Sequence, residues 1–113
     1  MPAEGSEGVL TDEELLKRAA AGDREAFDGI VTRHQAAVFR FARAATGGPA
    51  EAEDVLQETF LAAWRAAGTF QGRSAVRTWL LTITRNQAWH QRERAGRLPV
   101  DDVPLPELGE AAG

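Results

Sequence analysis

The sequence predicts an all-α protein, a compact bundle of about four helices. Apolar residues recur at steps of three and four along the chain, which is the period of an amphipathic helix. No segment alternates apolar and polar residues as a half-buried strand does. The 113 residues suit one domain with a modest core. Because cysteine is absent, packed helices must supply the stability that disulfides or a thiolate zinc site would otherwise give.

The first expected helix follows a leader, residues 1–10, whose lack of periodicity predicts flexibility. Thr11 or Asp12 can cap this short helix, and Thr11 can form a capping box with Glu14. Gly22 ends the helix in a sharp turn. The apolar side of the helix consists of Leu15, Leu16 and Ala19.

The second expected helix has the clearest periodic signal in the chain. Asp23 caps it, and it runs to about Thr46, where Thr-Gly-Gly-Pro stops it. Gly29 weakens it locally, by about 1 kcal/mol relative to alanine. Its inward residues are Phe27, Ile30, Val31, His34, Val38, Phe41, Ala42 and Ala45.

A third helix is expected from Ala50 to Ala67, with Pro49 at its start, where the missing N–H of proline does no harm. The inner stripe of this helix is Ala52, Val55, Leu56, Thr59, Phe60, Ala63, Trp64 and Ala67. A second face carries Asp54, Gln57, Glu58, Leu61 and Arg65.

The fourth expected helix follows a glycine-bounded loop, residues 68–73. Ser74 caps this helix, which runs to about Arg94. Its inward residues are Val76, Trp79, Leu80, Ile83 and Gln87, and a second stripe is Arg77, Leu81, Arg85 and Arg92. Residues 98–113 contain three prolines and four acids without a period, which indicates a linker.

The formal net charge of -4 argues against a nucleic-acid partner, but the charge is unevenly distributed. Between Arg73 and Arg97 there are six arginines and a single acid, Glu93. Arginine suits bidentate contacts to phosphates and base edges. No stretch approaches the ~18 apolar residues of a membrane span, and no secretion signal opens the chain. We therefore expect a cytoplasmic protein without membrane insertion, with one strongly cationic segment.

Neither a catalytic site nor a cofactor is expected, because the phosphate-binding, dinucleotide-binding, nucleophile-elbow and zinc-protease motifs are all missing. The acidic stretch GPAEAEDVLQET could in principle hold a divalent cation. It contains no histidine, so a solvated acidic face is the better interpretation and no metal site is predicted. His34 is expected in the core, and His90 on a solvated basic face.

Two surfaces have the residue types needed to bind partners. On the third helix, Leu61 shares a face with acids and an amide, and such a face can accept a basic, partly apolar helix. An isolated exposed leucine is common, so an ordinary surface remains the alternative.

The second surface combines the loop with the arginine stripe. It offers stacking, hydrogen bonding and phosphate contact, which are the requirements for holding unpaired bases. A glycine-rich loop can also form a small pocket for a flipped base. Phe70 either packs the loop onto the core or stacks on a base, Trp79 is expected in the core, and Trp89 either packs or faces DNA.

Three stretches of the chain, in this order and spacing, resemble region 2 of the extracytoplasmic-function (ECF) group of sigma factors. They are DEELLKRAAAGDREAFDGIVTRH, AEDVLQETFLAAWR and TFQGRSAVRTWLLTITRN. Each piece alone is weak, but together they make the resemblance specific over about residues 11–97.

The resemblance implies docking on core RNA polymerase, on the clamp helices of its largest subunit, through Asp54, Gln57, Glu58 and Leu61. It also implies that the loop and fourth helix recognise the minus-ten promoter element as melted non-template strand. The residues that match this DNA-binding role are Phe70, Gln71, Gly72, Arg73, Arg77 and Asn86, with Arg85 and Arg92 for phosphates and Arg33 and Arg40 guiding the strand.

Two departures from the family pattern limit what is carried over. Many members have an aspartate where this chain has His90, so that position receives no role. The family pattern continues into a second helical domain that binds the minus-thirty-five element, so we expect the chain to be part of a longer protein. The alternative function is an interaction module whose arginine stripe binds an acidic partner such as an anti-sigma factor, without direct DNA contact.

Overall fold

The structure, a computed structural model, describes residues 9–94 and 96. It has the helices α2 (Asp12–Ala20), α3 (Arg24–Ala45), α4 (Pro49–Ala66) and α5 (Val76–Arg94), with a short 3-10 turn, η1 (Ala67–Thr69), after α4. No strand occurs among the residues described, so the predicted all-α bundle of about four helices is confirmed. The predicted linker, residues 98–113, and most of the predicted leader lie outside the described part.

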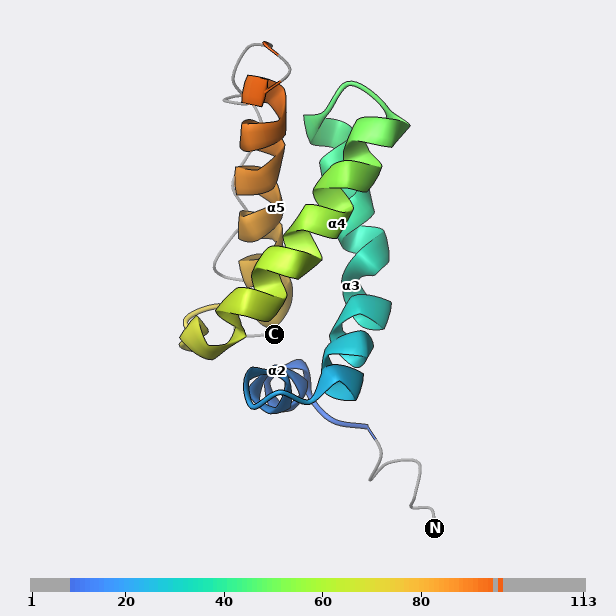
Figure 1. The fold of residues 1–113 in the computed structure, drawn as a ribbon. Coiled ribbons are helices and arrows are strands. Elements are labelled where there is room, and N and C mark those ends of the chain that lie inside the picture. Colours follow the sequence, from blue (N-terminus) through green and yellow to red (C-terminus); the bar gives the residue numbers. More distant parts are fainter. Residues whose placement is uncertain (1–8, 95, 97–113) are drawn as a thin grey trace.

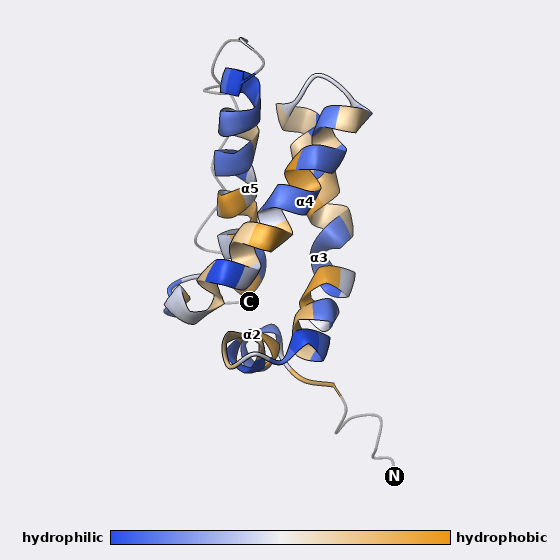
Figure 2. Cartoon of the chain, viewed as in Figure 1, coloured by the Kyte–Doolittle hydropathy of each residue, from blue (hydrophilic) through white to orange (hydrophobic). Residues whose placement is uncertain are grey.

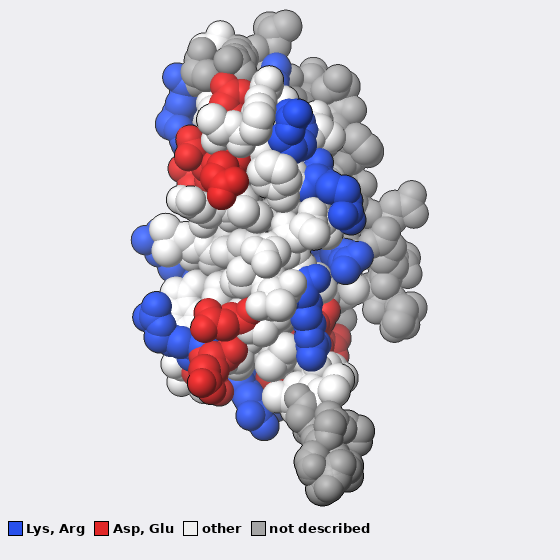
Figure 3. All heavy atoms as spheres, turned by 90° about the vertical axis from the view of Figure 1, so that its right-hand side faces the viewer, with Lys and Arg blue, Asp and Glu red and all other residues white. Residues whose placement is uncertain are grey.

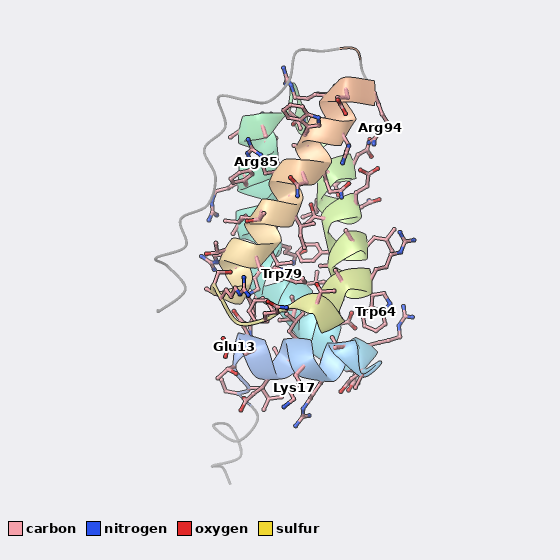
Figure 4. The ribbon with its side chains drawn as sticks, turned by 90° about the vertical axis from the view of Figure 1, so that its left-hand side faces the viewer. Glu13, Lys17, Trp64, Trp79, Arg85 and Arg94 are labelled. Carbon is pink, nitrogen blue, oxygen red and sulfur yellow. The ribbon has the colours of Figure 1, made fainter. Side chains whose placement is uncertain are left out.

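The three long helices form a bundle that α2 closes at one end. In Figure 1, α3, α4 and α5 stand side by side, and α2 lies across their lower ends. The perpendicular view in Figure 4 shows α2 crossing below the same three helices. We call this the α2 end; the opposite end carries the turn between α3 and α4 and the last turns of α5.

The first two helices begin where their capping residues predict. The Thr11 hydroxyl accepts a hydrogen bond from the Glu14 N–H at 3.0 Å, and the Glu14 carboxylate accepts one from the Thr11 N–H at 2.8 Å. In the same way Asp23 accepts from the Ala26 N–H at 3.1 Å at the start of α3. Each cap satisfies a backbone donor that the helix leaves unpaired and contributes about 1 kcal/mol.

The start of α5 differs from the prediction. The Trp79 N–H donates to the Ala75 carbonyl at 3.0 Å, so Ala75 rather than Ser74 occupies the capping position. The Ser74 hydroxyl instead donates to the Ala75 carbonyl at 3.1 Å, and the residue is buried. Ser74 therefore packs beneath the loop, and the prediction that it caps the helix is wrong.

The core has two unequal parts. The larger part fills the α2 end around Leu16, Ile30 and Leu80, with Phe27 and Phe60 in an edge-to-face contact at 6.3 Å. The smaller part lies toward the opposite end and consists of Ala42, Ala45, Ala52, Val55 and Ala88. We call this second cluster the alanine end. In Figure 2 the last turns of α5 are mostly hydrophilic, in keeping with this shift from large apolar to small side chains.

The inward face of α5 is only partly predicted by its apolar residues. Trp79, Ile83 and Gln87 are half-buried, whereas Thr78 and Thr84 are completely buried. The Thr84 hydroxyl donates to the Leu80 carbonyl one turn earlier, at 2.8 Å. Because the helix itself satisfies this hydroxyl, a threonine can enter the core without another polar partner.

Gly29 provides a close approach between two helices. A Cβ atom at this position would lie 3.2 Å from Leu15 Cδ1 of α2, which is tighter than an ordinary van der Waals contact. The glycine that weakens α3 in isolation therefore allows α2 to pack against it.

Candidate nucleic-acid interface and docking face

The loop between α4 and α5 is attached to the core through Phe70. Its half-buried ring meets the Trp79 ring edge-on, at a centroid distance of 5.5 Å and an interplanar angle of 69°. The Thr69 hydroxyl donates to the Ala66 carbonyl at 2.7 Å and holds the start of the loop. Phe70 thus packs the loop onto the core, which is one of the two roles considered for it; stacking of its partly exposed ring on a base stays a prediction.

A small hollow opens beside this aromatic pair. It encloses about 190 Å³ and is lined by Thr69, Phe70, Gln71, Arg73, Ser74 and Trp79. Gln71 and Arg73 are exposed at its edge. Gly72 has φ 75°, a backbone conformation that favours glycine and turns the loop around the hollow. The arrangement places one amide, one guanidinium and two aromatic rings around a space of ring size.

A second group of predicted DNA-binding residues lies where α3 meets α5. Arg40 and Arg77 line a shallow hollow of about 470 Å³ together with Ala37, Phe41 and Leu81. In Figure 4, Arg85 extends from α5 on the side of α3, whereas Arg94 extends on the side of α4. The fold thus brings arginines that are far apart in the sequence to one side of the bundle.

Another predicted residue, Asn86, lies on a different side of α5 from Arg85. At about 100° per residue it is displaced by that angle from Arg85, and it lies two turns beyond Trp79 on the same side. We therefore group the predicted DNA-binding residues into two sets, which we name the basic row and the loop row. The basic row is Arg33, Arg40, Arg77, Arg85 and Arg92, and the loop row is Phe70, Gln71, Gly72, Arg73 and Asn86.

Beneath the basic row is a hydrogen-bonded group that the sequence did not reveal. Asp12 of α2 accepts from Arg33 Nη1 at 2.9 Å and lies 2.8 Å from His34 Nε2. The other ring nitrogen of His34, Nδ1, accepts from Arg77 Nε at 3.4 Å. These residues come from three helices, and 21 or more positions separate the α2 and α5 members from those of α3, so no local pattern could indicate the contact.

His34 is buried as predicted, with 4% of its surface exposed. Burial lowers the pKa of its imidazole below the ordinary value, Asp12 opposes this effect, and Arg77 and Arg33 add to it. The neutral ring fits its neighbours, because Nε2–H can donate to Asp12 while the unprotonated Nδ1 accepts from Arg77.

We expect acid to destabilise the fold partly through this histidine. Unfolded His34 takes up a proton near pH 6.5, whereas the folded state, with its lowered pKa, resists protonation. The contribution of His34 to the free energy of unfolding is thus complete above the unfolded pKa and declines as the pH falls toward the folded one. Urea unfolding at several pH values should show a steeper decline for the unmodified chain than for His34→Gln; equal slopes would contradict the expectation.

The predicted docking residues lie together on the outward side of α4. Asp54, Gln57 and Leu61 are exposed, and half of the Leu61 surface is accessible. Both carboxylate oxygens of Glu58 lie 3.3 Å from Arg94 Nη2 of α5, a contact that the sequence did not indicate. Arg94 therefore offsets part of the acidic charge of this face.

Leu61 is not an isolated exposed leucine, because it borders an apolar groove between α3 and α4. The groove has a volume of about 420 Å³, and its apolar lining is Phe27, Val31, Leu56, Phe60, Leu61 and Trp64. Trp64 meets Phe27 edge-on at 5.3 Å, and the Arg24 guanidinium lies 5.8 Å from the Trp64 ring centroid. Val31, Leu56 and Trp64 were predicted to face inward, but they are only half-buried because they line this groove.

The surface around the groove has an uneven charge distribution. Figure 3 views the molecule from the side of α3 and α4. It shows acidic side chains in two groups beside a largely uncharged band, with a row of basic side chains toward the right-hand edge and further basic side chains next to the acidic groups. Within the described part of the chain, no three potential metal ligands gather into a site. None of the helices described there has the length and apolarity needed to cross a bilayer.

Comparison with known proteins identifies the class to which this fold and these surfaces belong. The family model of sigma-70 region 2 matches residues 30–98. RNA polymerase sigma-H factor of Pseudomonas aeruginosa is 39% identical over 88% of this chain and 51% of its own length. ECF RNA polymerase sigma factor SigM of Mycobacterium tuberculosis is 38% identical over 92% of this chain and 52% of its own length.

The chain belongs to the sigma-70 region 2 family and is similar to region 2 of ECF sigma factors. Among solved structures, that of CnrH in complex with the cytosolic domain of CnrY matches with a TM-score of 0.64 and 36% identity, over 81% of this chain and 61% of that one. The chain spans about half the length of the curated relatives named above. The resemblance inferred from the three sequence stretches is thereby confirmed.

Proposed function

We propose that this chain acts in transcription initiation as the part of a sigma factor that docks on core RNA polymerase and captures the non-template strand of the melted minus-ten element. The observation that carries the proposal is the presence, on one small bundle, of an apolar groove bordered by Leu61 of the docking face together with two sets of DNA-binding residue types.

The groove and the outward face of α4 would bind the clamp helices of the polymerase. Leu61 and Trp64 provide apolar contact at the groove, and Asp54 and Glu58 provide carboxylates on the same helix, α4. A basic helix with an apolar residue in its centre would complement both properties. The Glu58–Arg94 ion pair is exposed, so a partner arginine can replace Arg94 at little cost.

The loop row and the basic row would hold the opened strand. The hollow beside Phe70 and Trp79 has room for a planar ring, and Gln71 and Arg73 at its edge can hydrogen-bond a base. The arginines of the basic row would neutralise phosphates on either side. Opening DNA costs stacking of about 1.4 kcal/mol per step, and stacking of a captured base on an aromatic ring returns ~1–3 kcal/mol. Binding alone can therefore shift the duplex toward the open state, and no catalytic group is needed.

We expect Arg73→Ala to weaken binding of a single-stranded minus-ten oligonucleotide about tenfold, because a charged hydrogen bond to nucleic acid contributes roughly 1–3 kcal/mol. Fluorescence titration of the 113-residue chain with a labelled non-template strand would measure this. The matched control is Arg18→Ala, which removes the same charge from an exposed position on α2. Equal binding of a scrambled strand, with no effect of Arg73→Ala, would exclude the DNA-binding role.

A second candidate function is binding of an anti-sigma factor. The structure of the relative CnrH contains the cytosolic domain of CnrY, and the apolar groove is a suitable surface for an inhibitor helix. The two functions are compatible if the inhibitor covers the docking face. A peptide with the sequence of an inhibitor helix should compete with core polymerase for this chain if the two bind the same face, and a competition titration would test this.

A further inference from the structure

We propose that Asp12 and His34 are positioning residues that hold the guanidinium groups of Arg33 and Arg77 in place for DNA, so that α2 contributes to strand binding from beneath the basic row. The inference rests on the proposed function, since it concerns how the DNA-binding surface is organised.

The geometry joins the two arginines through one shared anchor. One oxygen of Asp12 accepts from Arg33 and the other lies 2.8 Å from His34, which in turn accepts from Arg77 at 3.4 Å. Asp12 is fixed because it lies in the first turn of α2, directly after the capping box. His34 is fixed because its ring is buried. A rigid support thus lies under two otherwise flexible side chains of an exposed surface.

The bonds involve the atoms that a positioning role requires. Arg77 contacts His34 through Nε, so this hydrogen bond does not use the two Nη groups, whose N–H donors can bind a phosphate. An arginine held at Nε loses less conformational freedom when it binds a ligand. Arg33 uses one Nη atom on Asp12, so a phosphate there would share the guanidinium with the carboxylate.

The charges around His34 also favour this arrangement. The groups facing it are Asp12 from α2, Arg77 from α5 and Arg33 from its own helix. A neutral imidazole can accept from Arg77, whereas a protonated one would present a second cation to it. Because the buried His34 ring is neutral, the Arg77 guanidinium can lie against it without repulsion between two cations.

Asp12 could have a purely structural role, which would be to hold α2 against α3. Variants that remove one negative charge from α2 distinguish this role from the proposed positioning role. Asp12→Asn and Glu13→Gln each remove one negative charge from the first turn of α2, but only Asp12 belongs to the hydrogen-bonded group. Loss of a negative charge alone should strengthen binding to DNA slightly. We expect Glu13→Gln to bind the single-stranded minus-ten oligonucleotide within twofold of the unmodified chain or slightly more tightly, and Asp12→Asn to bind it three- to tenfold more weakly.

His34→Phe provides a second variant, which keeps a buried ring but removes both of its hydrogen bonds. We expect it to weaken binding, and to have little further effect when combined with Arg77→Ala, because both changes act through the same guanidinium. Thermal unfolding would establish that each variant is folded. If Asp12→Asn does not fold, binding of the same oligonucleotide by His34→Phe and by the unmodified chain is compared instead.

The outcomes distinguish this inference from the function on which it rests. If Arg77→Ala leaves DNA binding unchanged, the basic row does not bind DNA as proposed, and the positioning role is overturned as well. If Arg77→Ala weakens binding but Asp12→Asn and His34→Phe do not, only the positioning role is overturned. A direct readout is the ¹⁵N spectrum of the histidine rings. At neutral pH we expect His34 to be protonated at Nε2 alone, with the exposed His90 as internal reference, and the opposite tautomer would also overturn the role.

Discussion

Replacing Leu61 with arginine is expected to weaken binding to core RNA polymerase by about 30-fold or more, the effect of losing a contact worth ~2 kcal/mol at the centre of an interface. Leu61 is half-exposed at the edge of the groove between α3 and α4. Arginine would remove the apolar anchor and add a cation to a face that is proposed to meet a basic helix. Titration of labelled chain with purified core polymerase would measure the change.

The chain offers a matched control for this substitution. Val9 is a large apolar residue with 70% of its surface exposed; it precedes α2 and is not among the residues that line the groove. Val9→Arg makes the same kind of exchange and should leave polymerase binding within about twofold. A similar loss for both variants would mean that added charge, and not the docking face, causes the effect.

The second large effect is expected on stability. Leu80 is completely buried in the larger core cluster, and Leu80→Ala should lower the free energy of unfolding by about 2–5 kcal/mol. Small domains have only ~5–15 kcal/mol in total, so this change alone should shift the urea midpoint strongly. Urea unfolding followed by circular dichroism would measure it.

Leu61→Ala is the comparison for this second prediction, because it makes the same side-chain change at a half-exposed position. We expect a cost below about 1 kcal/mol. Similar costs at the two positions would contradict the described packing of α5.

Apart from the Ser74 cap, the structure confirms the capping predictions, each of which depends on a single turn. The caps at Thr11 and Asp23 are local hydrogen bonds between residues three apart, so their spacing in the sequence was sufficient. The docking residues of α4 share a face for the same reason. Their functional role is a proposal, as is that of the basic row and the loop row.

Features formed between helices could not be predicted in this way. The groove beside Leu61 exists because α3 and α4 diverge next to Phe27 and Trp64, and a single helix does not encode that gap. The Asp12–His34–Arg77 contacts join three helices, and only the packed bundle brings them together. Ser74 was misjudged because tertiary packing buried a residue whose type favours a cap.

The alanine end sets a limit on how the sequence of this bundle can diverge. Ala42, Ala52 and Ala88 are completely buried, and they leave no space for a larger side chain without separating the helices. At the α2 end, the core contains leucine, isoleucine and phenylalanine, and substitutions among them that conserve the total volume cost little stability. Substitutions that alter recognition can therefore accumulate on the outer surface near the alanine end, while its interior stays almost fixed in size.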